Sequence, residues 1–576
     1  MKDLFKVVIQ LLRLSKDIPG SKALVTLIIV GGVISGLSNT LLIAVINNSL
    51  NKTQAPTTTL VLTFGALCLV LASLRFVSGA LLIHLMKKVT VSLRLRLCRK
   101  VLNAPLRLLE QLGAPRLIAT LTSDVRSITS AYIFLPGLCM NFAILLGCLI
   151  YLCWLSPLML VGSVIFMAIG IVSHQLPIMK TMHFIRRSRE TTDVVFNNLR
   201  GLIEGIKELK LHRGRRNEFY TKLIEPHTKA MEEDNATGEI IWAAAGSWGH
   251  ILFFIFVGLV LFAAPRLKPV DSLVLTGYTL TIMYLMGPLD FVLNFLPSLT
   301  RANVAIKKID TLTNSLDEQL VIEAGTDSEV NPSWQSIDLV GIEHAYRRES
   351  EEAEFTLGPI HLSLRPGEIL FITGGNGSGK TTLAKLLVGL YIPQRGEIRL
   401  DGKPITDERR DNYRQLFSVV FSDFYLFENL LGLSDFNIDT KAQDYLVKLQ
   451  LDRCVQIKDK RLSTLELSQG QRKRLALLTA YLEDRPIYVF DEWAADQDPQ
   501  FKEIFYFELL ARLKAAGKTA IVISHDDRFY HVADRVVKLN YGLIEVDNRV
   551  LTQNGKDVKE LATERDLLCA AVPLHE

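Results

Sequence analysis

The first half of the chain alternates long apolar runs with long polar stretches. Mainly apolar runs cover residues 23–47, 58–85, 132–155, 157–178, 239–264 and 272–297. Because a helix needs roughly 20 such residues to cross a bilayer, six membrane spans are predicted. Only the short CWLSP turn separates the third span from the fourth, so we expect these two to form a tight antiparallel pair.

The two long polar stretches, 86–131 and 179–238, hold most of the basic residues around the spans, whereas the loops on the other side hold few. Basic loops stay in the cytosol, so both stretches and both termini are predicted to be cytosolic. Apolar residues recur in these stretches at three- and four-residue spacing, which predicts helices that extend the spans into the cytosol.

A few polar side chains fall inside the predicted spans. Ionisable groups at membrane depth are costly and tend to face a cavity or a partner. Either some of them line a substrate path, or they lie near an interface or pair with one another. The residues in question are Arg75, His84, Asn141, His174, His250 and Asp290, of which Arg75, His250 and Asp290 are the candidates for a path.

The second half has a different pattern. After a charged helix predicted at about 300–318 comes an irregular stretch rich in acidic residues, Gly, Ser and Pro. Beyond it, short apolar or β-branched runs alternate with helical segments, which indicates an α/β domain. We therefore expect a membrane domain over 1–318, a linker over 319–335 and an α/β domain over 336–576.

Composition sharpens this division. The chain has 576 residues and a net charge of +5, with 33 basic against 22 acidic residues up to position 330 and 32 against 38 beyond it. The positive excess lies with the apolar runs, which excludes a uniformly basic nucleic-acid binder, and no nucleic-acid partner is expected. The seven cysteines form no C-x-x-C pair, so a disulfide framework or a zinc ribbon is not expected. The first 22 residues have scattered charge and no cleavage site, which indicates a cytosolic amphipathic segment.

The strongest chemical signal is ILFITGGNGSGKTTLAKLL, which matches G-x-x-x-x-G-K-[ST] between a predicted strand and a predicted helix. Such a loop closes backbone N–H groups around phosphate oxygens. Lys380 is expected to bridge the β- and γ-phosphates and Thr381 to ligate Mg²⁺, so ATP and Mg²⁺ are the predicted cofactors. The nucleotide-binding residues of this loop are Gly374, Gly375, Asn376, Gly377, Ser378, Gly379, Lys380, Thr381 and Thr382.

A second acidic signal is PIYVFDEW, in which an apolar run ends in Asp491 and Glu492. Asp491 fits the carboxylate on the Mg²⁺ side, and Glu492 fits the residue that activates the attacking water. Between the two signals lies LSQGQ, and after them comes IVISHDD, a predicted strand that leads into His525. Ser468 stands at a predicted helix start, where a hydroxyl and free N–H groups suit an anion.

The order P-loop, LSQGQ, DE and histidine resembles the nucleotide-binding domain of the ATP-binding-cassette (ABC) family. Six spans with two long cytosolic loops ahead of one cassette resemble an ABC exporter half-transporter. The resemblance implies a polytopic α-helical membrane domain of six transmembrane helices, fused to an α/β P-loop ABC ATPase domain. It also implies a multi-pass protein of the bacterial inner membrane, with its cassette in the cytosol, that couples ATP hydrolysis to transport.

The resemblance also assigns roles. Lys380, Glu492 and His525 would be catalytic, with His525 holding the γ-phosphate and the water. Tyr346, in the HAY segment, matches the aromatic that stacks on adenine, although it could also be an ordinary strand aromatic. The residues that would complete the site of a second subunit are Ser468, Gln469, Gly470 and Gln471 of LSQGQ, together with Asp498 in the loop that links the two sites.

Two departures from the usual ABC pattern narrow the resemblance. Exporters carry Gln where the two lobes of the cassette join, but aligning SVVFSDFYLF by its flanks puts Ser422 there, followed by Asp423, and either could reach the metal through water. Most exporters read DEATSALD where this chain reads DEWAADQD. Together with RKRLALL, this form resembles the cyclic peptide exporter subfamily, which includes exporters of cyclic lipopeptides and pyoverdine-type siderophore precursors.

This narrower resemblance implies ATP-driven efflux of a cyclic or amphipathic peptide product from the cytosol across the inner membrane. Because one cassette supplies a P-loop but no opposing LSQGQ, a homodimer embedded in membrane lipid is expected. The segment LRGLIEGIKELKL around Glu204 resembles a coupling helix, or it is a plain amphipathic helix. A lipid or glycolipid flippase is the alternative function. A non-transporting sensor or scaffold fits less well, because the hydrolytic set is complete.

Overall fold

The computed structural model describes residues 21–51, 58–267, 270–318, 333–346, 355–433 and 437–549. It divides into two compact units, here called the membrane unit (Met1–Cys98 and Pro115–Thr313) and the cassette unit (Arg99–Ala114 and Asn314–Glu576). Most of the predicted linker lies outside the described residues, as do the first 20 residues. The domain boundaries at 318 and 335 therefore stay predictions.

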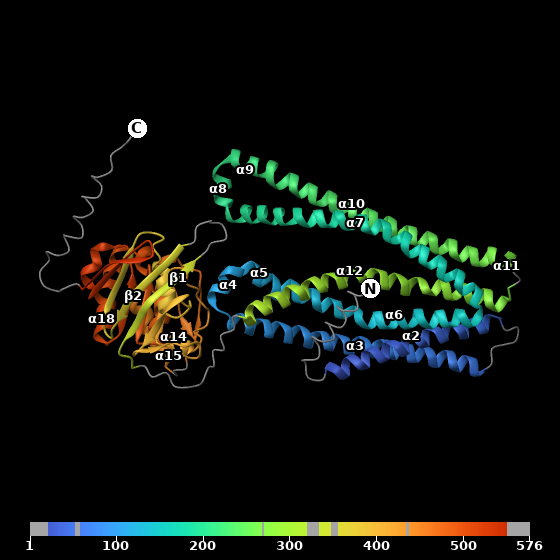
Figure 1. The fold of residues 1–576 in the computed structure, drawn as a ribbon, viewed down its shortest axis with the longest axis horizontal. Coiled ribbons are helices and arrows are strands. Elements are labelled where there is room, and N and C mark those ends of the chain that lie inside the picture. The colour runs from blue at the N-terminus through green and yellow to red at the C-terminus, as the bar shows by residue number, and fades with distance from the viewer. Residues whose placement is uncertain are drawn as a thin grey trace. The chain divides into compact units, whose positions relative to one another are not determined.

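Within the described residues, six helices are long and apolar enough to cross a membrane, in agreement with the six predicted spans (Figure 1). Four of the long helices lie wholly in the membrane unit, and α3 and α12 continue from it into the cassette unit. The long helices are α2 (Ser21–Asn51), α3 (Thr58–Leu102), α6 (Val125–Leu155), α7 (Pro157–Glu204), α10 (Glu225–Gly258) and α12 (Ser272–Glu318).

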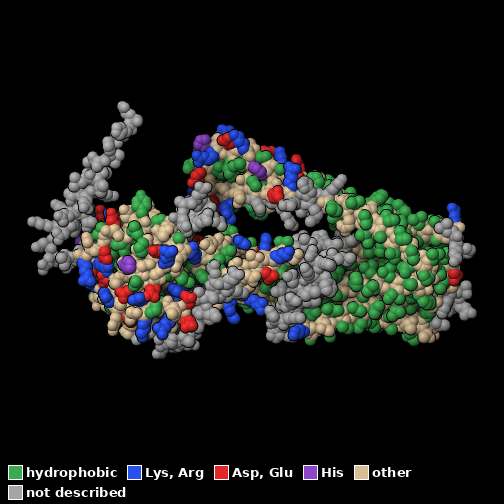
Figure 2. Space-filling model, viewed as in Figure 1, with side chains coloured by type: hydrophobic (Ala, Val, Ile, Leu, Met, Phe, Trp, Pro, Cys, Tyr) green, Lys and Arg blue, Asp and Glu red, His purple; other side chains and the backbone are tan. Residues whose placement is uncertain are grey.

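The polar stretches are helical, as predicted. The helices α3 and α7 continue beyond their apolar segments, to Leu102 and Glu204. Figure 2 shows apolar side chains covering the spans, and charged side chains gathered at the end of the membrane unit where α8 and α9 lie. The short elements of this unit are α5 (Ala114–Ala119), η1 (Thr120–Asp124), α8 (Ile206–Leu211), α9 (Arg213–Phe219), η2 (Tyr220–Ile224), η3 (Leu259–Ala263) and α11 (Ala264–Leu267).

The predicted tight pairing of the third and fourth spans is wrong. Ser156 alone joins α6 to α7, but α6 packs along α2 and α7 packs along α10. The reason lies in small residues that let α2 and α6 approach closely. A Cβ added to Gly36 would lie 2.6 Å from the Cβ of Ala143, and one added to Gly147 would lie 2.5 Å from the hydroxyl of Thr40. Because these small residues let the two helices approach closely, α6 packs along α2 rather than along α7.

The cassette unit contains a six-stranded sheet in the order β12-β11-β3-β10-β9-β6, parallel except for the β11–β12 pair. Its central strands read as continuous apolar runs because helices cover both faces. The strands are β3 (Ile369–Gly374), β6 (Phe417–Val420), β9 (Ile487–Asp491), β10 (Thr519–Ile523), β11 (Arg535–Asn540) and β12 (Leu543–Arg549).

Alternate residues of these strands enter two separate cores. Phe371 and Phe490 point to the core that includes α15 (Ile438–Lys448) and α16 (Gln469–Glu483). Ile372 points to the opposite core, with α13 (Lys380–Leu387). The remaining helices of the unit are α14 (Asp407–Arg414), η4 (Trp493–Asp496), α17 (Pro499–Glu503), η5 (Ile504–Leu509), α18 (Leu510–Ala515) and η6 (Asp527–Val532).

A four-stranded antiparallel sheet packs on the second core in the order β2-β1-β4-β5. Its strands and those of a small separate ribbon are β1 (Ile337–Tyr346), β2 (Phe355–Leu364), β4 (Arg395–Leu400), β5 (Lys403–Pro404), β7 (Ile457–Lys458) and β8 (Arg461–Leu462). The predicted α/β class of this part of the chain is confirmed.

One piece of the first polar stretch belongs to the cassette unit. The helix α4 (Leu106–Leu112) places Glu110 within 2.8 Å of the Lys385 ammonium, and Glu110 also accepts a hydrogen bond from Tyr391. Arg107 donates to the carbonyl of Ala345 at 3.2 Å. A segment between two candidate spans is thus fastened to the α/β domain within the cassette unit.

Candidate active site

The P-loop joins β3 to α13 at the edge where the parallel strands end. Its conformation requires glycine, because Gly374 and Gly379 have φ angles of 148° and 97°. A Cβ on Gly374 would lie 2.2 Å from the carbonyl oxygen of Leu539, and one on Gly379 would lie 2.7 Å from Leu357. The other loop residues differ in exposure: Gly375, Asn376 and Gly377 are exposed, Ser378 is buried, and Thr382 is half-buried on α13.

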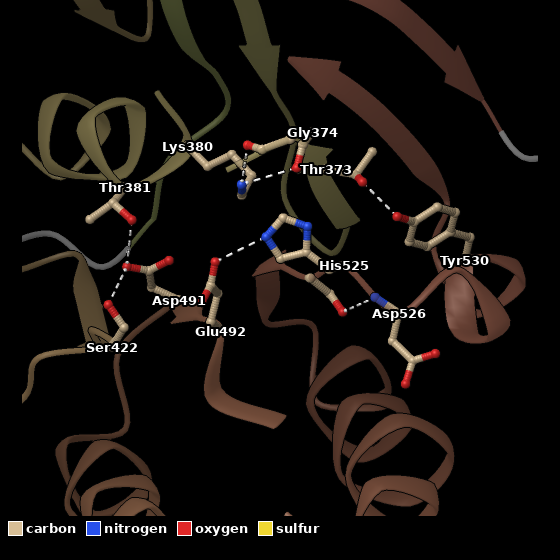
Figure 3. A network of polar contacts seen from close by, with 12 residues as sticks. Thr373, Gly374, Lys380, Thr381, Ser422, Asp491, Glu492, His525, Asp526 and Tyr530 are labelled. Atoms are coloured by element: carbon tan, nitrogen blue, oxygen red, sulfur yellow. Dashed lines mark hydrogen bonds and ion pairs between the residues drawn. The ribbon is translucent and has the colours of Figure 1, made fainter. Parts of the chain in front are cut away.

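Lys380 is buried at the start of α13. Its ammonium donates to the carbonyl of Gly374 at 3.1 Å and to that of Gly375 at 2.9 Å (Figure 3). Burial lowers the pKa of Lys380, and the negative charges of Glu492 and Asp491 oppose this effect. The ammonium therefore bonds to carbonyls of its own loop, and phosphate oxygens would replace these two carbonyls as acceptors.

Asp491 is fully buried at the end of β9. Its Oδ2 accepts hydrogen bonds from the hydroxyls of Thr381 at 3.0 Å and Ser422 at 3.3 Å. Burial raises the pKa of Asp491, against the lowering effect of the Thr381 hydrogen bond. Among the described residues, Oδ1 of Asp491 and the hydroxyl of Ser378 are buried without a hydrogen-bond partner. The carboxylate oxygen of Asp491 fits a ligand of Mg²⁺. The hydroxyl of Ser378 fits a hydrogen-bond donor to a phosphate oxygen.

Glu492 follows Asp491 and has an unusual backbone for a side chain of its size, with φ 50° and ψ 31°. Its Oε1 lies 3.1 Å from Nε2 of His525 (Figure 3). Both side chains are partly exposed, so water can reach them. The pairing of β9 with β10 sets Asp491 opposite Ile523, which brings the two strand ends together. A carboxylate beside an imidazole at an open edge can accept a proton from water.

The LSQGQ segment forms the start of α16. Ser468 caps this helix by accepting from the backbone N–H of Gln471, whose side chain accepts from the N–H of Ser468 in return. Ser468 and Gln469 are exposed, and Gly470 is half-buried beside the backbone of Asp496. Within the part of the chain that the structure describes, no hydrogen bond joins this segment to the P-loop.

Asp498 caps α17 by accepting from the N–H of Phe501 at 2.9 Å, and Arg474 donates to its other oxygen at 2.5 Å. The Phe501 N–H, followed by the charge of Arg474, holds the pKa of Asp498 below its usual range. Tyr346 is the last residue of β1, and its side chain lies outside the described part of the structure.

Two features of this site were not predicted from the sequence. The buried ammonium of Lys473 donates to the carbonyl of Glu492 at 2.8 Å. The hydroxyls of Thr373 and Tyr530 are hydrogen-bonded at 2.5 Å beside the end of β3 (Figure 3). The one sequence signal for the contact between Lys473 and Glu492 is the position of Lys473, two residues after LSQGQ.

The fold and this edge define a P-loop ATPase fused to a six-span membrane domain. The family model of the ABC transporter transmembrane region matches residues 23–289, and that of the ABC transporter matches residues 357–495. The ATP-binding protein SyrD of Pseudomonas syringae pv. syringae is 37% identical over 527 residues, which cover 90% of this chain and 93% of SyrD. An ATP-dependent lipid A-core flippase of Alkalilimnicola ehrlichii is 28% identical over 59% of each chain.

A solved bacterial Atm1-family ABC exporter with ATP bound superposes with a TM-score of 0.72 at 15% identity, covering 96% of this chain and 98% of the other. The chain belongs to the ABC transporter family and has the architecture of an exporter half-transporter. It binds ATP, and its hydrolysis of ATP is coupled to transport. It is a multi-span protein of the bacterial inner membrane with its ATPase domain in the cytosol.

Proposed function

We propose that this protein exports a cyclic or amphipathic peptide, of the lipopeptide or siderophore type, from the cytosol across the inner membrane as a homodimer. The observation that carries the ATP-driven step is the convergence of Lys380, Asp491 and the Glu492–His525 pair at one sheet edge. A degenerate cassette would lack at least one of these groups. The cargo class is inferred from the sequence relatives.

In this proposal the chain's own groups divide the work of hydrolysis. Thr381 and Asp491 would hold Mg²⁺, which when bound neutralises charge on the phosphates. The ammonium of Lys380 would leave the loop carbonyls and bind the β- and γ-phosphates. Glu492 would orient the water and take its proton, while His525 holds the γ-phosphate. Ser422 would orient Asp491 through the 3.3 Å hydrogen bond, in the place of the usual Gln.

The homodimer is supported by the exposure of two complementary surfaces on one cassette. Gly375, Asn376 and Gly377 of the P-loop are exposed, and so are Ser468 and Gln469 at the start of α16. The N–H groups at that helix start suit a phosphate. We infer that the P-loop of one copy faces LSQGQ and Asp498 of the other across ATP, so that two sites form together.

The tip of the α7–α10 hairpin offers a second contact between copies. Around Glu204 and α8 its apolar side chains are unusually open, with Ile203 75% and Leu211 88% exposed. Cytosolic apolar side chains of this exposure mark an interaction surface. We infer that this tip docks on the cassette of the partner copy and acts as the coupling element.

Two observations favour a peptide over a lipid as cargo. DEWAADQDP resembles the cyclic peptide exporter subfamily, and a relative at 37% identity spans nine-tenths of the chain, whereas lipid A-core flippases are only 28% identical over 59% of it or 25% identical over 83% of it. The membrane unit also holds an apolar cavity of about 120 Å³ whose lining includes His174 and Asp290. Polar groups on an apolar wall suit an amphipathic molecule, whether peptide or lipid, so this cavity does not separate the two cargo classes. Flipping of a lipid remains the alternative.

The test is ATP hydrolysis by the purified protein in lipid nanodiscs, with Glu492→Gln as the blank. Cyclic lipopeptides, siderophore-type peptides and lipids are added in separate arms. Stimulation by one peptide class, absent from the blank, is the expected result. Stimulation by lipid alone would replace the peptide proposal with the flippase alternative.

A further inference from the structure

Lys473 is a buried cation that the roles assigned above do not use. Its side chain is only 4% exposed, on the first turns of α16. The ammonium donates to the carbonyl oxygen of Glu492 at 2.8 Å and pairs with Asp496 at 2.7 Å. Because a buried cation is costly unless it is paired and hydrogen-bonded, these two partners account for its presence there.

The carbonyl that Lys473 holds belongs to a strained residue. Glu492 lies in the left-handed region, at φ 50° and ψ 31°, which is unfavourable for a residue with a Cβ. This backbone turns the chain sharply after β9 and directs the carboxylate to His525, 3.1 Å away. An unfavourable conformation persists only where its surroundings hold it. The Glu492 N–H donates to Ile523 at 3.1 Å, and Lys473 holds the carbonyl on the other side of the residue.

The same helix turns also hold the segment that follows Glu492. The indole N–H of buried Trp493 donates to the carbonyl of Lys473 at 2.7 Å. Arg474 donates to Gln497 at 2.9 Å, and Gln497 donates to the carbonyl of Gly470 at 3.0 Å. The start of α16 and residues 492–498 therefore form one connected body, so a shift of LSQGQ must move the backbone of Glu492.

We infer that Lys473 is a positioning residue that links LSQGQ to the catalytic carboxylate of the same chain. Since LSQGQ is proposed to touch ATP held by the partner copy, this link would align Glu492 in one site when the other site's ATP is engaged. The inference rests on the proposed role of Glu492 as the base. It assigns to Lys473 an effect on turnover that is separate from ATP binding.

The test compares two substitutions of similar volume by ATP hydrolysis in nanodiscs without cargo, over a range of ATP concentrations. Lys473→Met keeps the packing and removes the donor. Misplacing a catalytic group by about 1 Å can cost about 100-fold in rate, so kcat should fall by about tenfold or more while KM for ATP stays within about twofold. Lys473→Gln keeps a donor for the Glu492 carbonyl and should recover most of the lost kcat.

A matched control is Lys518, which contacts Asp484, the residue just after the other end of α16. Lys518 donates to the carbonyl of Asp484 at 3.1 Å and pairs with its carboxylate at 2.8 Å, and Asp484 is also left-handed, at φ 49°. Lys518→Met removes the same kind of contact far from the chemistry, and its kcat should stay within about twofold of wild type. Thermal melting of all variants separates loss of folding from loss of positioning.

Two results would overturn the inference. One is a folded Lys473→Met variant with wild-type kcat, and the other is an equal fall in kcat, ATP affinity and melting temperature for Met and Gln alike. If Lys473→Met fails to assemble, Lys473→Gln and Asp496→Asn take its place. Both keep a donor to the Glu492 carbonyl, so loss of turnover in either rejects the inference. Wild-type turnover in Glu492→Gln would reject the proposed base itself, which is a separate failure.

Discussion

The carboxylate of Glu492 lies 3.1 Å from the imidazole of His525, although 33 positions separate them in the chain. The contact arises because β9 and β10 are neighbouring parallel strands with Asp491 paired to Ile523, so the residues just beyond both strands meet at one edge. The carboxyl ends of parallel strands are where α/β domains place their ligands.

Glu492→Gln should abolish turnover and preserve ATP binding. Glutamine has the same size and can still bond His525, but it cannot take a proton from water. General-base catalysis contributes about 10²–10⁴-fold, so the rate of ATP hydrolysis should fall at least 100-fold. ATP should then hold the cassettes closed, which distance measurements between labelled cassettes would detect.

The control for this variant is Glu503→Gln, which changes an exposed carboxylate on α17. It should hydrolyse ATP at the wild-type rate. Comparable turnover in Glu492→Gln and wild type would place the base at another residue.

Asp491→Asn should stabilise the nucleotide-free cassette while removing its activity. Burial raises the pKa of Asp491 above its unfolded value, so the stability linked to this group is fully present below the unfolded pKa and is lost as pH rises through the folded pKa. The amide can still accept from Thr381 and carries no buried charge. Above a pH of about 4, the variant's cassette should melt higher than wild type, by about 2–4 °C for each kcal/mol gained.

Thermal melting without nucleotide or Mg²⁺, from acidic to neutral pH, measures this difference. The gap between variant and wild type should widen as pH rises. A lower melting temperature for Asp491→Asn at neutral pH would mean that a favourable partner for the carboxylate has been missed.

Ser422→Ala should weaken the use of Mg²⁺ without unfolding the protein. The hydroxyl of Ser422 holds Oδ2 of Asp491 at 3.3 Å from an exposed position. Such a hydrogen bond is worth about 1 kcal/mol, or about fivefold, so the Mg²⁺ concentration for half-maximal hydrolysis should rise by about that factor. An unchanged Mg²⁺ requirement in Ser422→Ala, together with a raised one in Asp423→Ala, would assign the role to Asp423.

Glu110→Ala should separate hydrolysis from its stimulation by cargo. Among the residues that the structure describes, Glu110 bonds to Lys385 and Tyr391 of the α/β domain and to no residue of the P-loop edge. Basal hydrolysis should persist, while stimulation by a peptide should be lost. The control is Glu508→Ala, which breaks an exposed ion pair with Arg512 at 3.4 Å. Full stimulation in Glu110→Ala would show that α4 carries no signal.

The parts of this protein that could be predicted from sequence are those set by local pattern. Six apolar runs gave six candidate spans, and the P-loop glycines fixed a turn that only glycine can adopt at Gly374 and Gly379. Ser468 and Gln471 have the spacing of a capping box, so the helix start at LSQGQ could also be predicted from sequence.

What could not be predicted depends on contacts between distant segments. The pairing of α6 with α2 follows from Gly36 and Gly147, whose importance appears only once the two helices lie together. The attachment of Glu110 to Lys385 joins residues 275 positions apart. The sequence does not distinguish Lys473 from the other basic residues after LSQGQ. Its role depends on the contact between its ammonium and the carbonyl of Glu492, which lies 19 positions further along the chain.

ATP-driven peptide export can be observed as uptake of a labelled cyclic lipopeptide into proteoliposomes with the cassettes facing outward. For peptide export we expect ATP-dependent accumulation with wild type and none with Glu492→Gln. ATP-dependent movement of a labelled lipid by wild type, with no uptake of any peptide tested, would contradict it.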